Sequence, residues 1–179
     1  MIKYVFLIFI LLSVKLSTEK ENFIQSDPIK LVQNGITITD LKNSTKNGKF
    51  IKEPLAEYGI DSENFGLTYL KNGDKIFFIW TKYNSDLIHE IILLDSSMAI
   101  DNITVGNSFN EFLKTNPNSE IKLDVVNSEY EYAQSDDGEY FVEFLTQDNK
   151  VAEYNDDYSC KRIINGNAKI DRIRIHKFE

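Results

Sequence analysis

The chain has 179 residues, with 20 Lys and Arg, 28 Asp and Glu, two His and one Cys, which gives a net charge of −8 at pH 7. An acidic surface repels phosphate, so nucleic-acid binding through a basic surface is excluded. The single Cys excludes a disulfide scaffold, and no Cys and His cluster exists for a zinc site. Hydrophobic residues make up 42% of the chain, which is enough for a folded core and too much for a disordered protein.

The first residues have the pattern of a secretory signal. Lys3 precedes an apolar run over residues 4–12, and the chain becomes polar at Ser13. Nine helical residues span roughly 14 Å, about half of the hydrocarbon core of a bilayer, so no permanent membrane span is expected. We predict a signal peptide over residues 1–17, a flexible segment over residues 18–28, and a secreted or periplasmic mature protein without a transmembrane segment. A buried N-terminal strand is the alternative.

Turn residues and apolar alternation predict mainly antiparallel strands. The clearest hairpin joins residues 67–70 to residues 76–80, because Asn72 and Gly73 can take positive φ at both turn positions. The long apolar run over residues 87–94 predicts a central strand that is covered on both faces. Further strands are expected over residues 35–38, 102–105, 121–126, 129–134, 139–145 and 170–176.

Two short helices are expected between the strands. Residues 54–58 form the weaker one, with Pro at the first helical position. The stronger one begins at Ser108, because Ser108 and Glu111 have the spacing of a capping box. Phe109 and Phe112 then fall on one face of this helix.

The sequence divides into two halves that share the order strand, helix, strands. The first half covers residues 29–100 and the second covers residues 101–179, and each is too small to bury much apolar surface alone. We therefore predict an α+β fold in one compact unit: two similar strand-helix-β-meander halves that form antiparallel sheets packed by short helices. The alternative is that any α+β chain can be divided in this way.

Residues 103–112 carry a resemblance to known proteins. A strand, Gly106, Ser108 and a helix resemble the start of small bacterial envelope proteins with the BamE-like and β-lactamase-inhibitor-like α+β fold. The layout of residues 30–176 is also similar to a family of uncharacterised bacterial envelope lipoproteins with a domain of unknown function. The chain departs from that family because it lacks a lipidation Cys and a second Cys for a disulfide. The resemblance implies a secreted binding or assembly module and brings no catalytic residues.

Catalytic and metal sites have weak signals in the sequence. His89 and His176 are isolated, and the acidic runs at residues 136–138 and 155–157 lack the spaced ligands of a calcium loop. Turn formation explains both runs. We expect Cys160 to be buried, and an intermolecular disulfide is the alternative. The prediction is a protein that is not an enzyme and has no cofactor or metal; a carboxylate-dependent hydrolase is the alternative, since acidic pairs are abundant.

Acidic residues concentrate in one segment. Residues 120–160 carry twelve acids and two bases, whereas residues 161–179 carry six bases and two acids. Removal of residues 1–17 takes away Lys3 and Lys15 and changes the net charge from −8 to −10. The acidic segment alone accounts for this mature charge, so it is the first place to look for a charged surface.

The acidic segment contains a predicted hairpin. A three-residue turn at residues 136–138 places Glu131 opposite Glu143. Like charges in that position destabilise a sheet, so a positive group is expected alongside. Alternation in the last strand offers one, because Arg172 and Arg174 share one face.

Two interpretations of this hairpin remain open. In the first, the arginines neutralise the glutamates and leave an ordinary sheet face. In the second, an acidic face binds a basic protein partner, and Tyr side chains supply contact area. We predict a non-enzymatic binding module, with an inhibitor or immunity-type protein as its sharpest version; a purely structural envelope component is a further alternative. The candidate partner-binding residues are Glu129, Glu131, Glu139, Glu143, Tyr154, Tyr158, Arg172 and Arg174.

Overall fold

The computed structural model describes residues 28–45, 47–126 and 129–176. The predicted signal peptide and residues 18–27 lie outside the described residues, whereas Pro28 begins the first described helix. Across these described ranges, no helix has the length and apolar character needed to cross a membrane.

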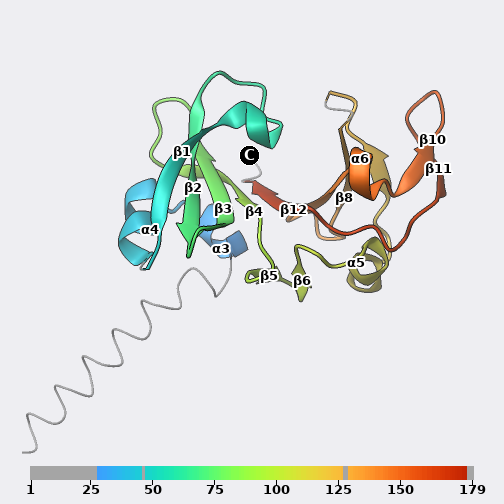
Figure 1. Ribbon diagram of the computed structural model, residues 1–179, viewed down its shortest axis with the longest axis horizontal. Coiled ribbons are helices and arrows are strands. Elements are labelled where there is room, and N and C mark those ends of the chain that lie inside the picture. The colour runs from blue at the N-terminus through green and yellow to red at the C-terminus, as the bar shows by residue number, and fades with distance from the viewer. Residues whose placement is uncertain (1–27, 46, 127–128, 177–179) are drawn as a thin grey trace, which may run out of the picture.

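Eight antiparallel strands form one curved sheet in the order β1-β2-β3-β4-β12-β9-β8-β7 (Figure 1). The late strand β12 pairs with β4 on one side and with β9 on the other. It therefore joins a first arm, β1 to β4, to a second arm, β9 to β7. The strands are β1 Lys49–Pro54, β2 Phe65–Lys71, β3 Asp74–Thr81, β4 Ile88–Leu93, β7 Ile121–Leu123, β8 Tyr130–Gln134, β9 Phe141–Leu145 and β12 Arg172–His176.

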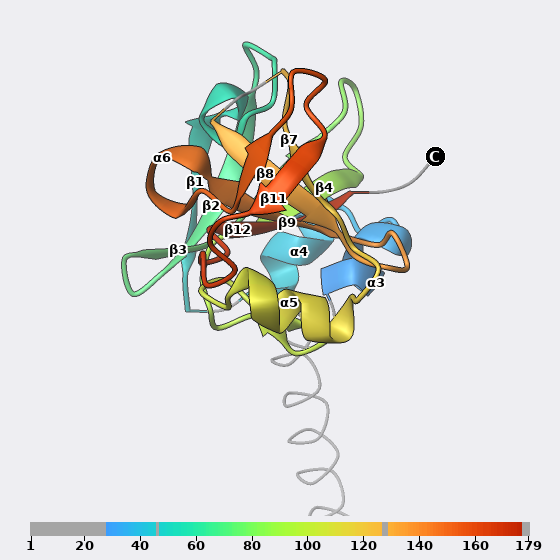
Figure 2. The ribbon, with the colours of Figure 1, turned by 90° about the vertical axis from the view of Figure 1, so that its right-hand side faces the viewer.

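Two small hairpins and five short helices complete the described fold. Figure 2 shows α3, α4 and α5 together on one side of the sheet. The hairpins are β5 Ala99–Ile100 with β6 Ile103–Thr104 and β10 Ala152–Tyr154 with β11 Cys160–Ile163. The helices are α3 Pro28–Gln33, α4 Ile38–Ser44, η1 Leu55–Tyr58 (a 3₁₀ helix), α5 Phe109–Thr115 and α6 Thr146–Asn149.

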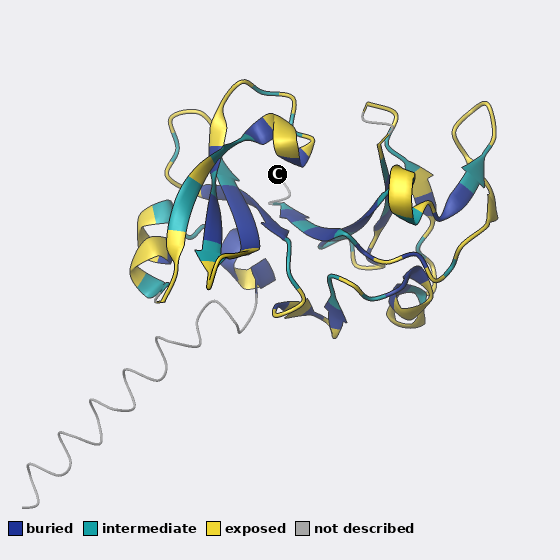
Figure 3. Ribbon diagram, viewed as in Figure 1, coloured by how far each residue is buried: buried dark blue, intermediate teal, exposed yellow. Residues whose placement is uncertain are grey.

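The two faces of the sheet are covered differently. On the helix face, Ile173 and Ile175 pack in the main core together with residues of α3, α4 and α5. The opposite face, here called the η1 face, carries a second core over the first arm, where Tyr58 of η1 stacks on Phe78 with ring centroids 3.7 Å apart. Buried residues run along the central strands, and exposed residues lie on the loops and outer helix faces (Figure 3).

Several sequence predictions are confirmed. The sheet is antiparallel and the helices are short, as expected for an α+β fold. Asn72 and Gly73 form the β2–β3 turn with φ of 55° and 99°. Strand β4 is central, between β3 and β12, and its apolar residues are buried.

Other predictions need correction. Residues 35–38 do not form a strand; Thr37 instead caps α4, because its hydroxyl accepts a hydrogen bond from the Asp40 amide at 3.0 Å. The segment still makes one isolated bridge, from Thr37 to Leu87, and the helix that begins at Ile38 ends this pairing. Pro54 ends β1 and occupies the N-cap position of η1 rather than its first helical position.

The predicted capping box of α5 is confirmed. The Ser108 amide donates to the Glu111 carboxylate at 2.6 Å, and the Glu111 amide donates to the Ser108 hydroxyl at 3.2 Å. These bonds satisfy amides that would otherwise lack partners at the helix start. The cap fixes the position of Phe109 and Phe112, which are both buried in the main core.

The capping box makes stability depend on pH. The backbone amide of Ser108, followed by its hydroxyl, holds the pKa of Glu111 below its ordinary value of 4.5. A depressed carboxyl pKa adds stability above the unfolded value, and this contribution is lost as pH falls through the folded pKa. We expect Glu111→Gln to lower the urea midpoint at about pH 7, and the difference from wild type to shrink at about pH 3. The control Glu63→Gln removes an exposed charge elsewhere; an unchanged difference for Glu111→Gln at low pH would contradict the assignment.

Candidate binding site

The β8–β9 hairpin differs from its predicted register by one residue. Glu131 lies opposite Phe144 rather than Glu143. The turn is longer than predicted: the Ser135 amide donates to the Tyr140 carbonyl at 2.9 Å, and the Tyr140 amide donates to the Ser135 hydroxyl at 3.1 Å. A one-residue change moves side chains to the other face of a strand. The predicted pair of facing glutamates is therefore wrong, and the two carboxylates lie on opposite faces.

Glu131 is a buried hydrogen-bond acceptor on the helix face. The residue is 0% exposed, and its carboxylate accepts the amides of Val151 and Ala152 at 2.5 and 3.0 Å. These bonds hold the start of β10 against β8. Burial and the Glu131 carboxylate both raise the pKa of Tyr154, the last residue of β10. Glu131 consequently has no exposed surface with which to contact a partner.

Glu143 lies at the centre of a buried ion-pair network on the η1 face. It is opposite Arg172 in the β9–β12 register and forms ion pairs with Arg172 and Arg174; the distance from Arg174 Nε to Glu143 Oε1 is 2.7 Å. Arg174 also pairs with Glu90 of β4 and donates from Nη2 to the Tyr58 carbonyl at 2.8 Å. We call Glu90, Glu143, Arg172 and Arg174 the central network. The interpretation in which the arginines neutralise a glutamate is confirmed for Glu143.

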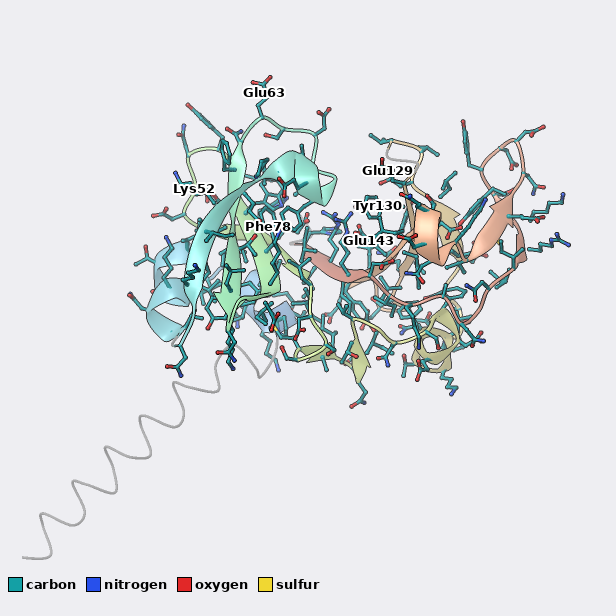
Figure 4. All side chains as sticks on the ribbon, in the orientation of Figure 1. Lys52, Glu63, Phe78, Glu129, Tyr130 and Glu143 are labelled. Carbon is teal, nitrogen blue, oxygen red and sulfur yellow. The ribbon has the colours of Figure 1, made fainter. Side chains whose placement is uncertain are left out.

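Burial and ion pairing oppose each other in the electrostatics of the central network. Burial raises the pKa of Glu90, and Glu143 adds to this effect while Arg174 opposes it. For Arg174, burial favours a lower pKa, but Glu143 and Glu90 outweigh it and the net pKa is raised. The guanidinium of Arg172 lies 3.8 Å from the ring centroid of Tyr130, a favourable cation–π contact. Figure 4 shows Tyr130 beside Glu143 near α6. Each charge has a partner, so the network links β4, β12 and β9.

The remaining predicted residues lie at separate places. Glu139 accepts a hydrogen bond from Gln33 Nε2 of α3 at 2.9 Å. Glu129 is exposed just before β8, and Tyr154 is half-buried in β10. Tyr158 is 56% exposed in the β10–β11 turn. The structure therefore does not bring the eight predicted residues to one surface.

A groove of about 920 Å³ lies at the outer edge of the second arm. Residues 119–126, which include edge strand β7, form one wall, and residues 157–160 of the β10–β11 hairpin contribute the other. Helix α5 contributes Phe109 and Leu113. In Figure 2 this arm faces the viewer, with β11 in front and α5 below. We call this feature the edge groove.

Exposed apolar side chains gather at the edge groove. Val126 is 87% exposed and Val125 is 64% exposed, and Tyr158 and Ile163 add to the lining. Grouped exposed apolar side chains mark binding surfaces. Sequence reasoning missed this site because Val125 and Val126 continue an apolar strand pattern, and because β11 has no strand signal. The groove forms because the tertiary fold places β7 near the β10–β11 hairpin, and the sequence does not show this proximity.

The single cysteine also lines the edge groove. Cys160 is exposed, so its expected burial is wrong. Partial burial, followed by the carboxylates of Glu131 and Glu120, raises the pKa of the Cys160 thiol. The thiol is therefore mainly protonated and weakly nucleophilic at neutral pH.

The two acidic runs form turns, as predicted. Asp137 accepts hydrogen bonds from the Ser135 hydroxyl at 2.6 Å and the Glu139 amide at 3.0 Å. Asp157 accepts one from the Ser159 amide at 3.1 Å. In the part of the chain that the structure describes, no group of three or more His, Cys, Asp or Glu side chains is arranged to hold a metal ion.

The central network predicts a large stability effect. Glu143→Gln removes the carboxylate charge that Arg172, which is buried, shares with Arg174, which is partly buried. An uncompensated buried charge costs about 3–5 kcal/mol. We expect a corresponding loss in the free energy of unfolding, measured by urea denaturation with circular dichroism. The matched control Glu129→Gln changes an exposed residue and is expected to shift stability by less than about 0.5 kcal/mol. Equal midpoints for the two variants would contradict the structural role of Glu143.

Comparison with known proteins shows a shared fold. The crystal structure of the uncharacterised protein yfeY from Escherichia coli matches with a TM-score of 0.51 and 12% sequence identity, over 82% of this chain and 92% of that chain. The structural superposition, rather than the low sequence identity, supports the mixed architecture with a large antiparallel sheet, and fold alone carries no function. No protein-family model matches the sequence, and no curated protein does.

Proposed function

We propose that the protein is a non-enzymatic binding module that holds a protein partner outside the cytoplasm. The observation that carries this proposal is the edge groove, where Val125, Val126 and Tyr158 expose apolar surface to solvent. When a partner covers exposed apolar surface at the rim of a groove, that surface leaves water and the free energy of the complex falls. An inhibitor or immunity-type protein is the most specific form of this proposed role.

The acidic segment, residues 120–160, supports the proposal, but the acidic residues that line the edge groove are not the ones that the sequence predicted. Glu131 and Glu143 satisfy interior groups, so they are not a contact surface. Glu120, Asp124 and Asp157 line the edge groove instead. We therefore place the proposed contact with a basic partner at the edge of the sheet, beside β7, and not on the face of the sheet.

The hydrolase alternative has weaker support. Glu90 and Glu143 are the two carboxylates that share Arg174, and they are 6% and 8% exposed. A catalytic acid or base must come within hydrogen-bond reach of its substrate. Their burial and ion pairing favour a structural role for both.

The proposed location outside the cytoplasm is supported by the sequence alone. Lys3 and the apolar run over residues 4–12 are typical of a signal peptide. Expression of the full chain followed by fractionation tests this point. We expect a shortened protein in the periplasm or medium; a full-length protein in the cytoplasm would contradict it.

We also infer that the two halves, residues 29–100 and 101–179, are related. Thr37 caps α4 and bridges to Leu87 just before β4, while Ser108 caps α5 and bridges to Lys169 just before β12. Each helix precedes strands that follow one another toward the middle of the sheet. The resemblance to BamE-like and β-lactamase-inhibitor-like proteins stays a prediction.

Affinity capture tests the binding role. The mature protein is immobilised and exposed to envelope extract, and bound proteins are identified by mass spectrometry. We expect a partner that Val126→Asp and Tyr158→Asp lose, because each places a charge on apolar contact area. The matched control Tyr83→Asp changes a side chain that is 88% exposed on the first arm, and it should retain the partner. Capture that all three variants retain would contradict a contact at the edge groove.

A further inference from the structure

We propose that the edge groove binds an extended segment of the partner as an additional strand along β7, and that this segment alternates apolar side chains with Lys or Arg. This inference depends on the proposed function and specifies the chemistry of the partner. It draws on three features of the groove: its backbone, its side chains and its charge.

The backbone of β7 has an outward-facing edge. The Asp124 amide donates to the Tyr130 carbonyl at 3.0 Å, in register with the pair Leu123 and Glu131. Inward and outward bonding alternate along an antiparallel strand, so the N–H and C=O groups of Ile121 and Leu123 point away from β8. Strand β7 ends the eight-stranded order. Among the residues that the structure describes, no further strand pairs with this edge of β7, and such an edge can accept an extended peptide through main-chain hydrogen bonds.

The side chains around β7 define what an added strand would carry. Ile121 is buried on the helix face, where Leu113 of α5 and Ile163 of β11 also line the groove. Lys122 lies opposite Tyr132 and points to the η1 face. Successive side chains of an added strand would alternate between these two environments. Apolar side chains fit the helix-face side, between α5 and the β10–β11 hairpin.

The charge of the groove selects the remaining side chains. Glu120 and Asp124 flank Lys122 at alternate positions, and Asp157 lies in the opposite wall. These three carboxylates outnumber the single ammonium group of Lys122, so the lining of the edge groove carries a net negative charge. Lys or Arg at alternate positions of the added strand complements these carboxylates and steers association.

The same charge disfavours a second copy of this chain as the occupant. Pairing of two β7 edges would bring two sets of acidic residues together, and like charges across a sheet are destabilising. The net charge, −8 for the full chain and −10 after removal of residues 1–17, adds long-range repulsion between copies. A basic segment of another protein fits better.

Synthetic peptides test the proposal directly. The probe is a fluorescein-labelled nine-residue peptide of alternating Lys and Val, and binding to the mature protein is followed by fluorescence anisotropy. Two control peptides separate the contributions: one replaces every Lys by Glu, and one replaces a central Val by Pro, which keeps the charge but removes an amide donor. We expect binding of the Lys–Val peptide, no binding of the Glu–Val peptide, and at least about tenfold weaker binding of the Pro peptide.

Variants and a positional readout locate the binding. The double variant Glu120→Lys/Asp124→Lys is expected to weaken binding at least about tenfold, whereas Glu57→Lys/Glu63→Lys, with the same charge change on the first arm, should weaken it less than about twofold. Peptide binding should slow amide hydrogen exchange at Ile121 more than at any other described residue except Leu123. Peptide binding should also slow the alkylation of Cys160, whose thiol lines the edge groove.

The possible outcomes are distinguishable. Equal binding of the Pro peptide, or slowed exchange on the first arm alone, overturns pairing with β7. Dimers on size-exclusion chromatography with protected β7 amides identify a second copy as the occupant and overturn the basic segment. If Val126→Asp abolishes partner capture while no peptide binds, the binding module stands and the added strand is wrong. If the peptide binds but no partner is captured, the strand site stands and the proposed function loses its support.

Discussion

The position of β12 between β4 and β9 is the constraint on which the rest of the structure depends. The last strand of the described chain lies in the middle of a sheet whose first strand begins at residue 49. Its alternation serves both faces: Ile173 and Ile175 enter the main core, while Arg172 and Arg174 neutralise glutamates of both neighbouring strands. A buried charge without a partner is strongly destabilising, so a pairing of β12 that separated these arginines from Glu90 and Glu143 would carry a large cost.

The second arm depends on a single carboxylate in a similar way. Glu131 accepts two backbone amides at the start of β10, and buried amides require such partners. This connection fixes the base of the β10–β11 hairpin across the helix face of β8. The hairpin in turn supplies one wall of the edge groove. The acidic character that made Glu131 a candidate contact residue therefore has an architectural use, and the edge groove lies one strand further out, at β7.

Local signals in the sequence were reliable where one short segment contained all the interacting groups. The Asn72-Gly73 turn and the Ser108–Glu111 cap depend on neighbours within four residues. The register of β8 and β9 failed because it depends on turn length: Ser135 pairs with Tyr140, and one extra turn residue moves Glu131 to the other face. The edge groove had no sequence signal, because its walls come from segments some thirty residues apart.

By itself, the sequence determined the antiparallel α+β class, the central position of β4, the face that Arg172 and Arg174 share, and the concentration of acidic residues between residues 120 and 160. These properties follow from composition, alternation and local hydrogen bonds. Only the tertiary structure decided which acids are interior acceptors and which line an open groove. Burial and long-range pairing are properties of the assembled sheet, because the same carboxylate is an acceptor for amides inside it and a solvated charge at its edge.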